Sequence, residues 1–224
     1  MATRRRVLLS WSSGKDSAWT LRTLRRDPDV DVVGLLTSFN VTADRVAMHA
    51  VRRELVTQQA AAIGLPLRAV ELPWPCSNAD YEKALVTAFE SLAGQFDTVA
   101  FGDLFLEDIR EYRITQMAAL GVVPEFPIWG LNTTNLANEI IASGIEAVLT
   151  CVDPKQCPAE FAGRAFDAAL LQALPTSVDR CGENGEFHTF VHASPDFVNR
   201  INVEVGEIVE RDGFVFADVT PIRA

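Results

Sequence analysis

The chain has 224 residues, 48% of them hydrophobic, with 20 basic and 30 acidic side chains and a formal net charge of −10. This length fits one large domain, or one domain with a small appendage. The acidic balance disfavours a broad nucleic-acid-binding surface, which needs many lysine and arginine contacts to phosphate.

Apolar runs and helical patterns alternate along the first half of the chain. Val7 to Ser10 predicts a strand, and the polar segment after it leads into a helical pattern that includes Leu21 and Leu24. Further strands are predicted at 30–37, 67–72 and 98–101, and helices at 46–63, 80–93 and 108–120. This alternation predicts an α/β fold with a parallel sheet covered by helices on both faces.

The second half of the chain is less regular. We expect helices at 135–143 and 165–174 and strands at 146–152, 201–209 and 214–219, with the Asp-Gly pair of Arg211-Asp212-Gly213 favouring a hairpin. Pro124, Pro127 and Gly130 interrupt the alternation, so we place a domain boundary there. Residues 1–126 would form the main domain and 127–224 a smaller α+β lobe that ends in the hairpin.

A serine-rich loop, Ser12-Ser13-Gly14-Lys15-Asp16-Ser17, separates the first predicted strand from the first helix. At such a junction, backbone amides and the positive end of the helix dipole suit a polyphosphate. Gly14 permits close approach, and we expect Lys15 and Asp16 on an exposed loop. The loop does not match the Walker pattern of mononucleotide-binding proteins, because Leu9 stands where that pattern has its first glycine. It does not match the dinucleotide-binding fingerprint either, because that needs three glycines and Gly14 is the only glycine in the loop. A plain turn rich in helix-capping serines is the alternative.

The loop resembles the SGGKDS signature of PP-loop ATP pyrophosphatases, with Ser13 at the second residue's usual glycine. A serine fits there if its φ is negative. The resemblance implies a HUP-like (adenine nucleotide alpha hydrolase-like) nucleotide-binding domain. The residues that it assigns to ATP are Ser10, Ser12, Ser13, Gly14, Lys15, Asp16, Ser17, Thr37 and Gly102.

Polar residues also follow the strand predicted at 98–101. Gly102 and Asp103 should emerge at the carboxyl edge of the sheet, near the serine-rich loop. In the helix that follows, Arg110 and Arg113 flank Tyr112, and arginines can bind phosphate or a carboxylate. We therefore expect functional roles for Asp103 and Arg113.

A third polar cluster, Gly182-Glu183-Asn184-Gly185-Glu186-Phe187, is followed by His188 and Thr189. This density of polar side chains is unusual for a plain turn. The alternative is a tight turn in which the Asn and Glu side chains form hydrogen bonds with the backbone of the turn itself. With the other clusters, it is similar to the GE-x-GE-aromatic motif of the diphthine-ammonia ligase family, over nearly the whole chain. His188 departs from the family pattern, which has an acid there, and leaves the substrate open.

The resemblance implies an ATP-dependent acid–ammonia ligase. A carboxylate attacks the α-phosphate of ATP, pyrophosphate leaves, and ammonia displaces AMP to give an amide. The catalytic residues would be Lys15, Asp16 and Asp103, with Asp16 and Asp103 also holding Mg²⁺ with ATP. The residues that it implies for the substrate are Arg110, Tyr112, Arg113, Glu183, Asn184, Glu186, His188 and Thr189.

The acceptor implied by the family is diphthine on elongation factor 2 in archaea or eukaryotes, and another carboxylate in a bacterium. A PP-loop tRNA-modifying enzyme and a module that binds ATP or AMP without turnover stay open as alternatives. The four scattered cysteines lack paired metal-binding spacing, and the short apolar run after the basic N-terminus is too short for a secretory signal. We therefore expect a cytoplasmic protein without nucleic-acid or membrane partners. The sequence assigns no role to His49 and leaves a homo-oligomer open.

Overall fold

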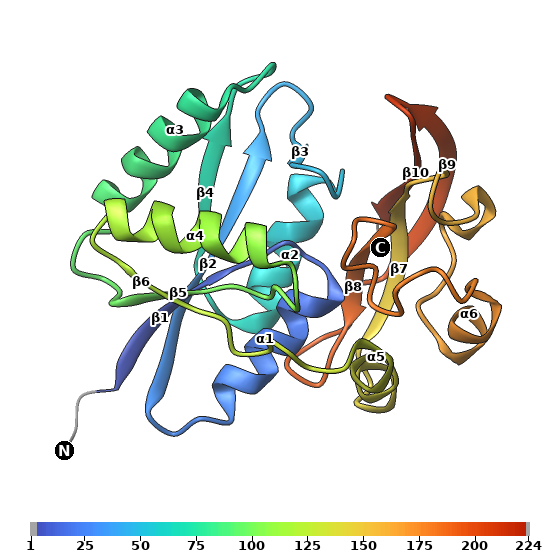
Figure 1. The fold of residues 1–224 in the computed structure, drawn as a ribbon, viewed down its shortest axis with the longest axis horizontal. Helices are drawn as coiled ribbons and strands as arrows, with labels where there is room; N and C mark the ends of the chain where they lie inside the picture. Colours follow the sequence, from blue (N-terminus) through green and yellow to red (C-terminus); the bar gives the residue numbers. More distant parts are fainter. Residues whose placement is uncertain (1–3, 223–224) are drawn as a thin grey trace.

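The computed structural model describes residues 4–222, and the ends of the two predicted domains, 1–3 and 223–224, lie outside this range. The described chain forms two sheets that lie side by side (Figure 1). The first is a six-stranded, mostly parallel sheet with helices, and the second is a four-stranded antiparallel sheet. The predicted α/β class, with a smaller C-terminal α+β part, is confirmed.

The first sheet has the strand order β3-β2-β1-β5-β6, with β4 also paired to β2. All of its pairs are parallel except β2 with β3. The order reverses between β1 and β5, and open α/β sheets bind ligands beyond the carboxyl ends of the strands at such a point. Its strands are β1 (Arg5–Ser10), β2 (Val30–Asn40), β3 (Arg45–Val46), β4 (Leu67–Leu72), β5 (Thr98–Ala100) and β6 (Val123–Glu125).

Helices cover both faces of this sheet because side chains of a strand alternate between faces. On β1, Leu9 packs in a cluster with Leu21 and Leu55, whereas Leu8 packs in a second cluster with Met117. No helix among residues 4–222 is both long and apolar enough to cross a lipid bilayer. The helices are α1 (Lys15–Arg25), α2 (Arg53–Ile63), α3 (Asn78–Ser91), α4 (Glu107–Ala119), α5 (Thr133–Ala142), the short 3₁₀ helix η1 (Ala159–Phe161) and α6 (Ala168–Ala173).

The second sheet has the order β8-β7-β10-β9 and contains the expected hairpin. Its strands are β7 (Glu146–Val152), β8 (Phe187–Ala193), β9 (Val203–Arg211) and β10 (Phe214–Pro221). Asp212 and Gly213 join β9 to β10 with φ of 53° and 82°, the positive values that a tight hairpin turn requires. Phe187 and Phe190 of β8 belong to the same apolar cluster as Leu9, so both sheets share one core.

Two local predictions are wrong. The helix expected from residue 46 begins at Arg53, because the preceding segment forms β3 and a turn in which Met48 and Ala50 have positive φ. Pro124 was expected to interrupt the alternation, but it lies within β6. Because β6 is the edge strand beyond β5, the missing amide of proline can face away from the sheet.

Candidate functional site

The serine-rich loop leads from the carboxyl end of β1 into the first turn of α1. Gly14 is the N-cap residue, and its carbonyl accepts the first helical hydrogen bond, from Ala18 N at 3.1 Å. Lys15 N donates to Thr189 Oγ1 at 3.1 Å, the amide of Asp16 faces its own carboxylate, and the amide of Ser17 has no partner among the described residues. The Ser17 amide, at the positive end of the helix dipole, is therefore available to an anion.

Ser13 adopts a φ of 72°, so the condition of a negative φ at this position is not met. The residue is fully buried, and its Oγ has no hydrogen-bond partner among the described residues. Its carbonyl accepts hydrogen bonds from Val191 N at 2.9 Å and from Gln59 Nε2 at 3.0 Å. These contacts hold a serine in a conformation that costs an L-residue about 1–2 kcal/mol.

Gln59 on α2 was not predicted, yet it ties the loop to the second sheet. It is fully buried, and its Oε1 accepts from Trp11 Nε1 at 2.8 Å. Its Nε2 donates to Val191 O at 2.6 Å as well as to Ser13 O. The sequence did contain a signal for this role. Gln59 is four positions from both Leu55 and Ile63, so it is a polar residue on the apolar face of the helix.

Lys15 does not lie on an exposed loop, contrary to the prediction. Its side chain is 2% exposed, and Nζ bonds both carboxylate oxygens of Asp16, at 3.1 and 2.8 Å, and the carbonyl of Cys181. Phe166 and Phe187 place their ring centroids 5.5 and 5.4 Å from Nζ. Burial opposes the charge, but Asp16 holds the pKa of Lys15 above its usual value, so the side chain stays a cation.

The remaining polar side chains of this region brace the backbone. Thr37 Oγ1 donates to Trp11 O at 2.7 Å, and Ser17 Oγ donates to Gly14 O at 2.9 Å. Ser12 Oγ lies 3.3 Å from Ser17 Oγ, and Ser10 pairs with Leu36 at the end of β1. These predicted ATP-site residues therefore lie together around the loop.

Gly102 and Asp103 follow β5 and reach the same edge of the sheet. A Cβ on Gly102 would lie 3.0 Å from Thr20 Oγ1 and 3.3 Å from the Asp16 carbonyl, so glycine permits this close approach to α1. Asp103 forms a two-point ion pair with Arg113, at 2.6 and 3.1 Å.

The two other predicted residues of α4 make contacts of their own. Arg110 lies over the rings of Phe126 and Trp129, at 5.4 and 4.7 Å from their centroids. The Tyr112 hydroxyl accepts from Gln116 Nε2 at 2.6 Å, and the side chain of Tyr112 is exposed. Neither residue has a hydrogen bond to the serine-rich loop among the residues described.

The two glutamates of the polar turn at residues 182–187 make different contacts. Glu183 Oε1 accepts from Leu104 N at 2.6 Å, so this carboxyl group reaches the segment after β5. Burial, together with the charges of Asp16 and Asp103, raises the pKa of Glu183 to about 7. Glu186 is buried and braces its own turn, accepting from Asp179 N and Asn184 Nδ2 at 2.9 Å each.

His188 on β8 pairs with His49, with ring centroids 4.3 Å apart and planes 32° from parallel. Burial lowers the pKa of His188 to about 4 and that of His49 well below its ordinary value, so both rings are neutral at pH 7. His49 Cε1 would lie 3.5 Å from a Cβ on Gly14. The pair therefore lies beside the serine-rich loop.

The side chains predicted to hold Mg²⁺ do not form a ready metal site. Asp16 faces the ammonium of Lys15, and both oxygens of Asp103 face Arg113. Within residues 4–222, no group of three or more His, Cys, Asp or Glu side chains is arranged to ligate a metal. The four cysteines are free thiols, three of them buried.

Comparisons with known proteins agree on one family. The family model of the diphthamide synthase N-terminal domain matches residues 5–121, and that of the diphthamide synthase C-terminal domain matches 132–219. Diphthine–ammonia ligases of Rattus norvegicus and Bos taurus are 31% and 30% identical over 124 residues, which is 53% of this chain and 46% of theirs. The chain thus spans about half the length of these curated relatives.

A solved structure described as a predicted subunit of tRNA methyltransferase from Methanocaldococcus jannaschii also aligns. It covers 84% of this chain and 96% of its own, with 15% identity and a TM-score of 0.40. A likeness at this level carries no conclusion about function.

Proposed function

Because this chain belongs to the diphthamide synthase family, we propose that it is an ATP-dependent amide ligase that joins a carboxylate to ammonia. The carboxylate oxygen attacks the α-phosphate of ATP, and pyrophosphate leaves. Ammonia then attacks the acyl carbon of the adenylate, an amide bond forms, and AMP leaves with the oxygen. The acceptor would be diphthine in an archaeon or a eukaryote, and another carboxylate in a bacterium.

The contact between Glu183 and the segment after β5 is the observation that carries the proposal. Glu183 Oε1 accepts from Leu104 N at 2.6 Å, while Asp103 precedes Leu104 and Gly102 packs on the first turn of α1. Three clusters far apart in the sequence therefore meet at one sheet edge. A two-substrate reaction needs such convergence, because its reactants must be held together.

The serine-rich loop is proposed to receive the leaving pyrophosphate. The amide of Ser17 lies at the helix terminus without a partner among the described residues, and the Lys15 ammonium contacts the carboxylate of Asp16 at 2.8 Å. Fixed donors of this kind stabilise charge that develops on a leaving group. Mg²⁺ is proposed to enter with ATP, since in nucleotide sites it is bound by the substrate phosphates together with several waters and one or two carboxylates.

Glu183 is proposed to accept a proton from ammonium, the nitrogen donor. Ammonia enters largely as ammonium at neutral pH and must lose a proton before it can attack. A carboxyl group with a pKa of about 7 is matched to that transfer. This assignment concerns Glu183 alone, because Glu186 is engaged within its own turn.

The test is product analysis with ATP, Mg²⁺, ammonium chloride and a panel of carboxylic acids. We expect AMP and pyrophosphate in equal amounts, dependent on the acid, together with one amide. ADP and phosphate as stoichiometric products would refute the proposal. Nucleotide binding with no turnover for any acid would instead favour a sensing module.

A further inference from the structure

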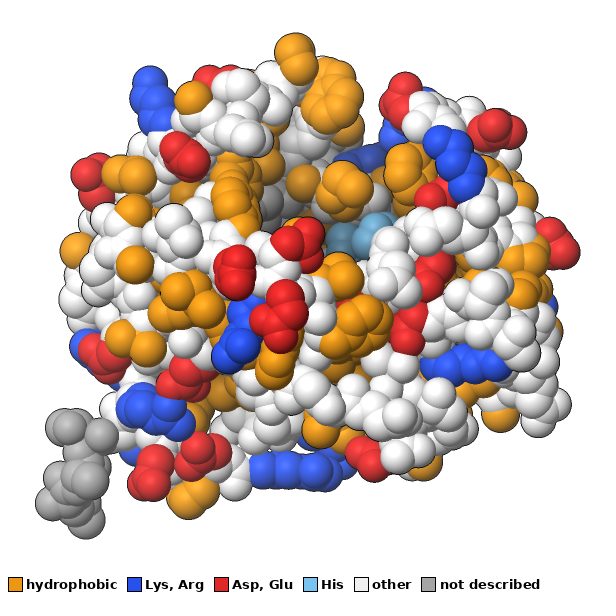
Figure 2. Space-filling model, in the orientation of Figure 1, with side chains coloured by type: hydrophobic (Ala, Val, Ile, Leu, Met, Phe, Trp, Pro, Cys, Tyr) orange, Lys and Arg blue, Asp and Glu red, His pale blue; other side chains and the backbone are white. Residues whose placement is uncertain are grey.

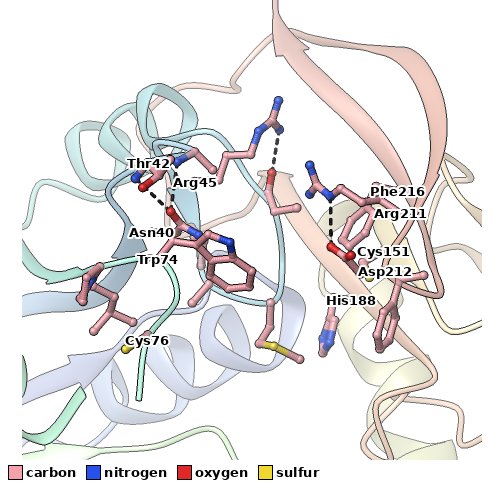
Figure 3. A pocket seen from close by; sticks show the side chains of 18 residues that line it. Asn40, Thr42, Arg45, Trp74, Cys76, Cys151, His188, Arg211, Asp212 and Phe216 are labelled. Carbon is pink, nitrogen blue, oxygen red and sulfur yellow. Dashed lines mark hydrogen bonds and ion pairs between the residues drawn. The ribbon is translucent and has the colours of Figure 1, made fainter. Parts of the chain in front are cut away.

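The turn at residues 179–186 leads into β8, a strand that contacts the serine-rich loop and borders a cavity of about 480 Å³ between the two sheets. Figure 2 shows this face of the molecule hollowed between its two halves, with histidine side chains in the hollow. His188 of β8 is one of the side chains that line the cavity (Figure 3). The turn therefore continues directly into the strand beside the proposed site.

The side chain of Asp179 organises this turn. Its Oδ1 accepts from Cys181 N at 2.9 Å and from Glu183 N at 3.2 Å. Its own backbone amide donates to Glu186 Oε1 at 2.9 Å. An aspartate that accepts from the amides two and four residues further along fixes the path of the backbone between them. Asp179 therefore sets the orientation of residues 181 and 183.

Asp179 is also anchored to α5. Its Oδ2 accepts from Thr133 Oγ1 at 2.5 Å, and Thr133 is the first residue of that helix. A second contact joins the same two segments, because Cys181 Sγ lies 3.4 Å from Thr133 O. Both oxygens of the Asp179 carboxylate are thus engaged, one by the turn and the other by the helix. The turn is held against α5 through this one side chain.

Two groups of the turn reach the proposed site from this position. The carbonyl of Cys181 accepts from Lys15 Nζ, and Glu183 Oε1 accepts from Leu104 N at 2.6 Å. They belong to the same two residues whose amides bind Asp179. A shift of the turn would therefore move both groups at once, one away from the serine-rich loop and the other away from the segment after β5.

We infer that Asp179 is a positioning residue, whose hydrogen bonds hold Glu183 at the sheet edge and the Cys181 carbonyl on Lys15. Its importance for amide formation rests on the proposed function, whereas its effect on these two contacts does not. Reacting groups must be held within about 0.5 Å of their productive geometry. Asparagine should replace Asp179, because its oxygen can accept from both amides and its NH₂ can donate to the Thr133 hydroxyl.

The amide proton of Leu104 reports on the Glu183 contact without any turnover, since a hydrogen-bonded amide proton resonates downfield of a free one. Its chemical shift is measured by NMR on the full chain, and Glu183→Ala gives the reference value without the carboxylate. We expect Asp179→Ala to move this resonance toward the reference. With ATP, Mg²⁺, ammonium and the panel of acids, the same variant should lower amide formation by about 100-fold, as a misplacement of about 1 Å can.

Two further variants separate positioning from general stability. Asp179→Asn should keep the Leu104 resonance and amide formation near their wild-type values. Asp167→Ala is the matched control, because Asp167 also accepts from a backbone amide, that of Leu170 at 2.7 Å, where it caps α6. It should lower the melting temperature and leave the Leu104 resonance in place. If Asp179→Ala does not fold, Thr133→Val removes only the anchor to α5 and should move the resonance in the same direction by less.

An unmoved Leu104 resonance in folded Asp179→Ala protein, or in Thr133→Val protein where that variant takes its place, would overturn the inference. An asparagine variant as impaired as the alanine variant would also overturn it, because hydrogen bonding would not be the cause. A moved resonance with unchanged amide formation would uphold the ligase and overturn the positioning role. A moved resonance with no amide formation even by the wild type would uphold the effect of Asp179 on Glu183 and overturn the ligase.

Discussion

Thr189 Oγ1 accepts a hydrogen bond from the backbone amide of Lys15 at 3.1 Å, so strand β8 of the second sheet caps the first turn of α1. Two residues further along β8, Val191 N donates to the carbonyl of Ser13 at 2.9 Å. The serine-rich loop is thus held by the second sheet as well as by its own strand and helix. The geometry of the proposed ATP site should therefore depend on β8.

Thr189→Val tests this dependence, because it removes the hydroxyl and nearly preserves the shape. The loss of one buried hydrogen bond should lower the free energy of unfolding by about 1–2 kcal/mol. If the loop shifts as a result, ATP affinity measured by calorimetry should also fall. Thr189→Ser keeps the acceptor and should restore ATP affinity. If ATP affinity in both variants equals that of the wild type, the hydrogen bond from β8 does not position the loop.

Gln59→Leu should be more damaging, since it leaves Trp11 Nε1 and Val191 O without their partner. Buried polar groups left unpaired cost about 1–3 kcal/mol each, so we expect a clear fall in the melting temperature and weaker ATP binding. Gln58→Leu, the neighbouring position of α2, is the matched control. Similar losses in both variants would indicate a general effect on the helix.

Ser13→Gly should stabilise the protein. Glycine adopts the φ of 72° without penalty, and the change removes a buried hydroxyl that has no partner among the described residues. The gain, offset by the greater freedom of glycine in the unfolded chain, is about 1 kcal/mol in chemical denaturation. Ser13→Ala is the comparison, because it removes the hydroxyl but keeps the strained Cβ. An alanine variant as stable as the glycine variant would rule out backbone strain as the cause.

The sequence predicted the elements whose signals are local. The strands at 67–72 and 146–152 were predicted with the bounds that the structure gives, because short apolar runs end there at turns. Asp212 and Gly213 form the expected hairpin because their turn preference does not depend on distant residues. The sequence also predicted correctly that Gly102 emerges near the serine-rich loop, because parallel strands end at one edge.

Features set by contacts between distant segments could not be predicted. Lys15 is buried because the second sheet covers the loop, bringing Phe187 and the Cys181 carbonyl to its ammonium. Gln59 gains its role from partners at positions 11, 13 and 191. The same packing sets the φ of Ser13. The predicted roles of the site residues remain predictions until the variants are measured.

Glu183→Gln separates the electrostatic role of this carboxyl group from its structural one. The pKa of Glu183 is raised from 4.5 to about 7, chiefly by burial, so the folded chain holds a proton that the unfolded chain releases. Stability should therefore fall as the pH rises from about 4.5 to 7, by at most about 3 kcal/mol and by less where solvent screens the group.

Glutamine cannot ionise, yet it keeps the oxygen that accepts from Leu104 N. The variant should match wild-type stability near pH 4.5 and exceed it at pH 8, as measured by melting temperature across that range.

Amide formation by the wild type should rise as the pH passes about 7 and Glu183 becomes able to accept a proton from ammonium. At a fixed concentration of free ammonia, the rate in the variant should be low without that rise, while ATP affinity is unchanged. Glu186→Gln is the matched control, because this residue braces its own turn and should leave the pH dependence in place. An unaltered pH profile in folded Glu183→Gln protein would remove Glu183 from the proton transfer.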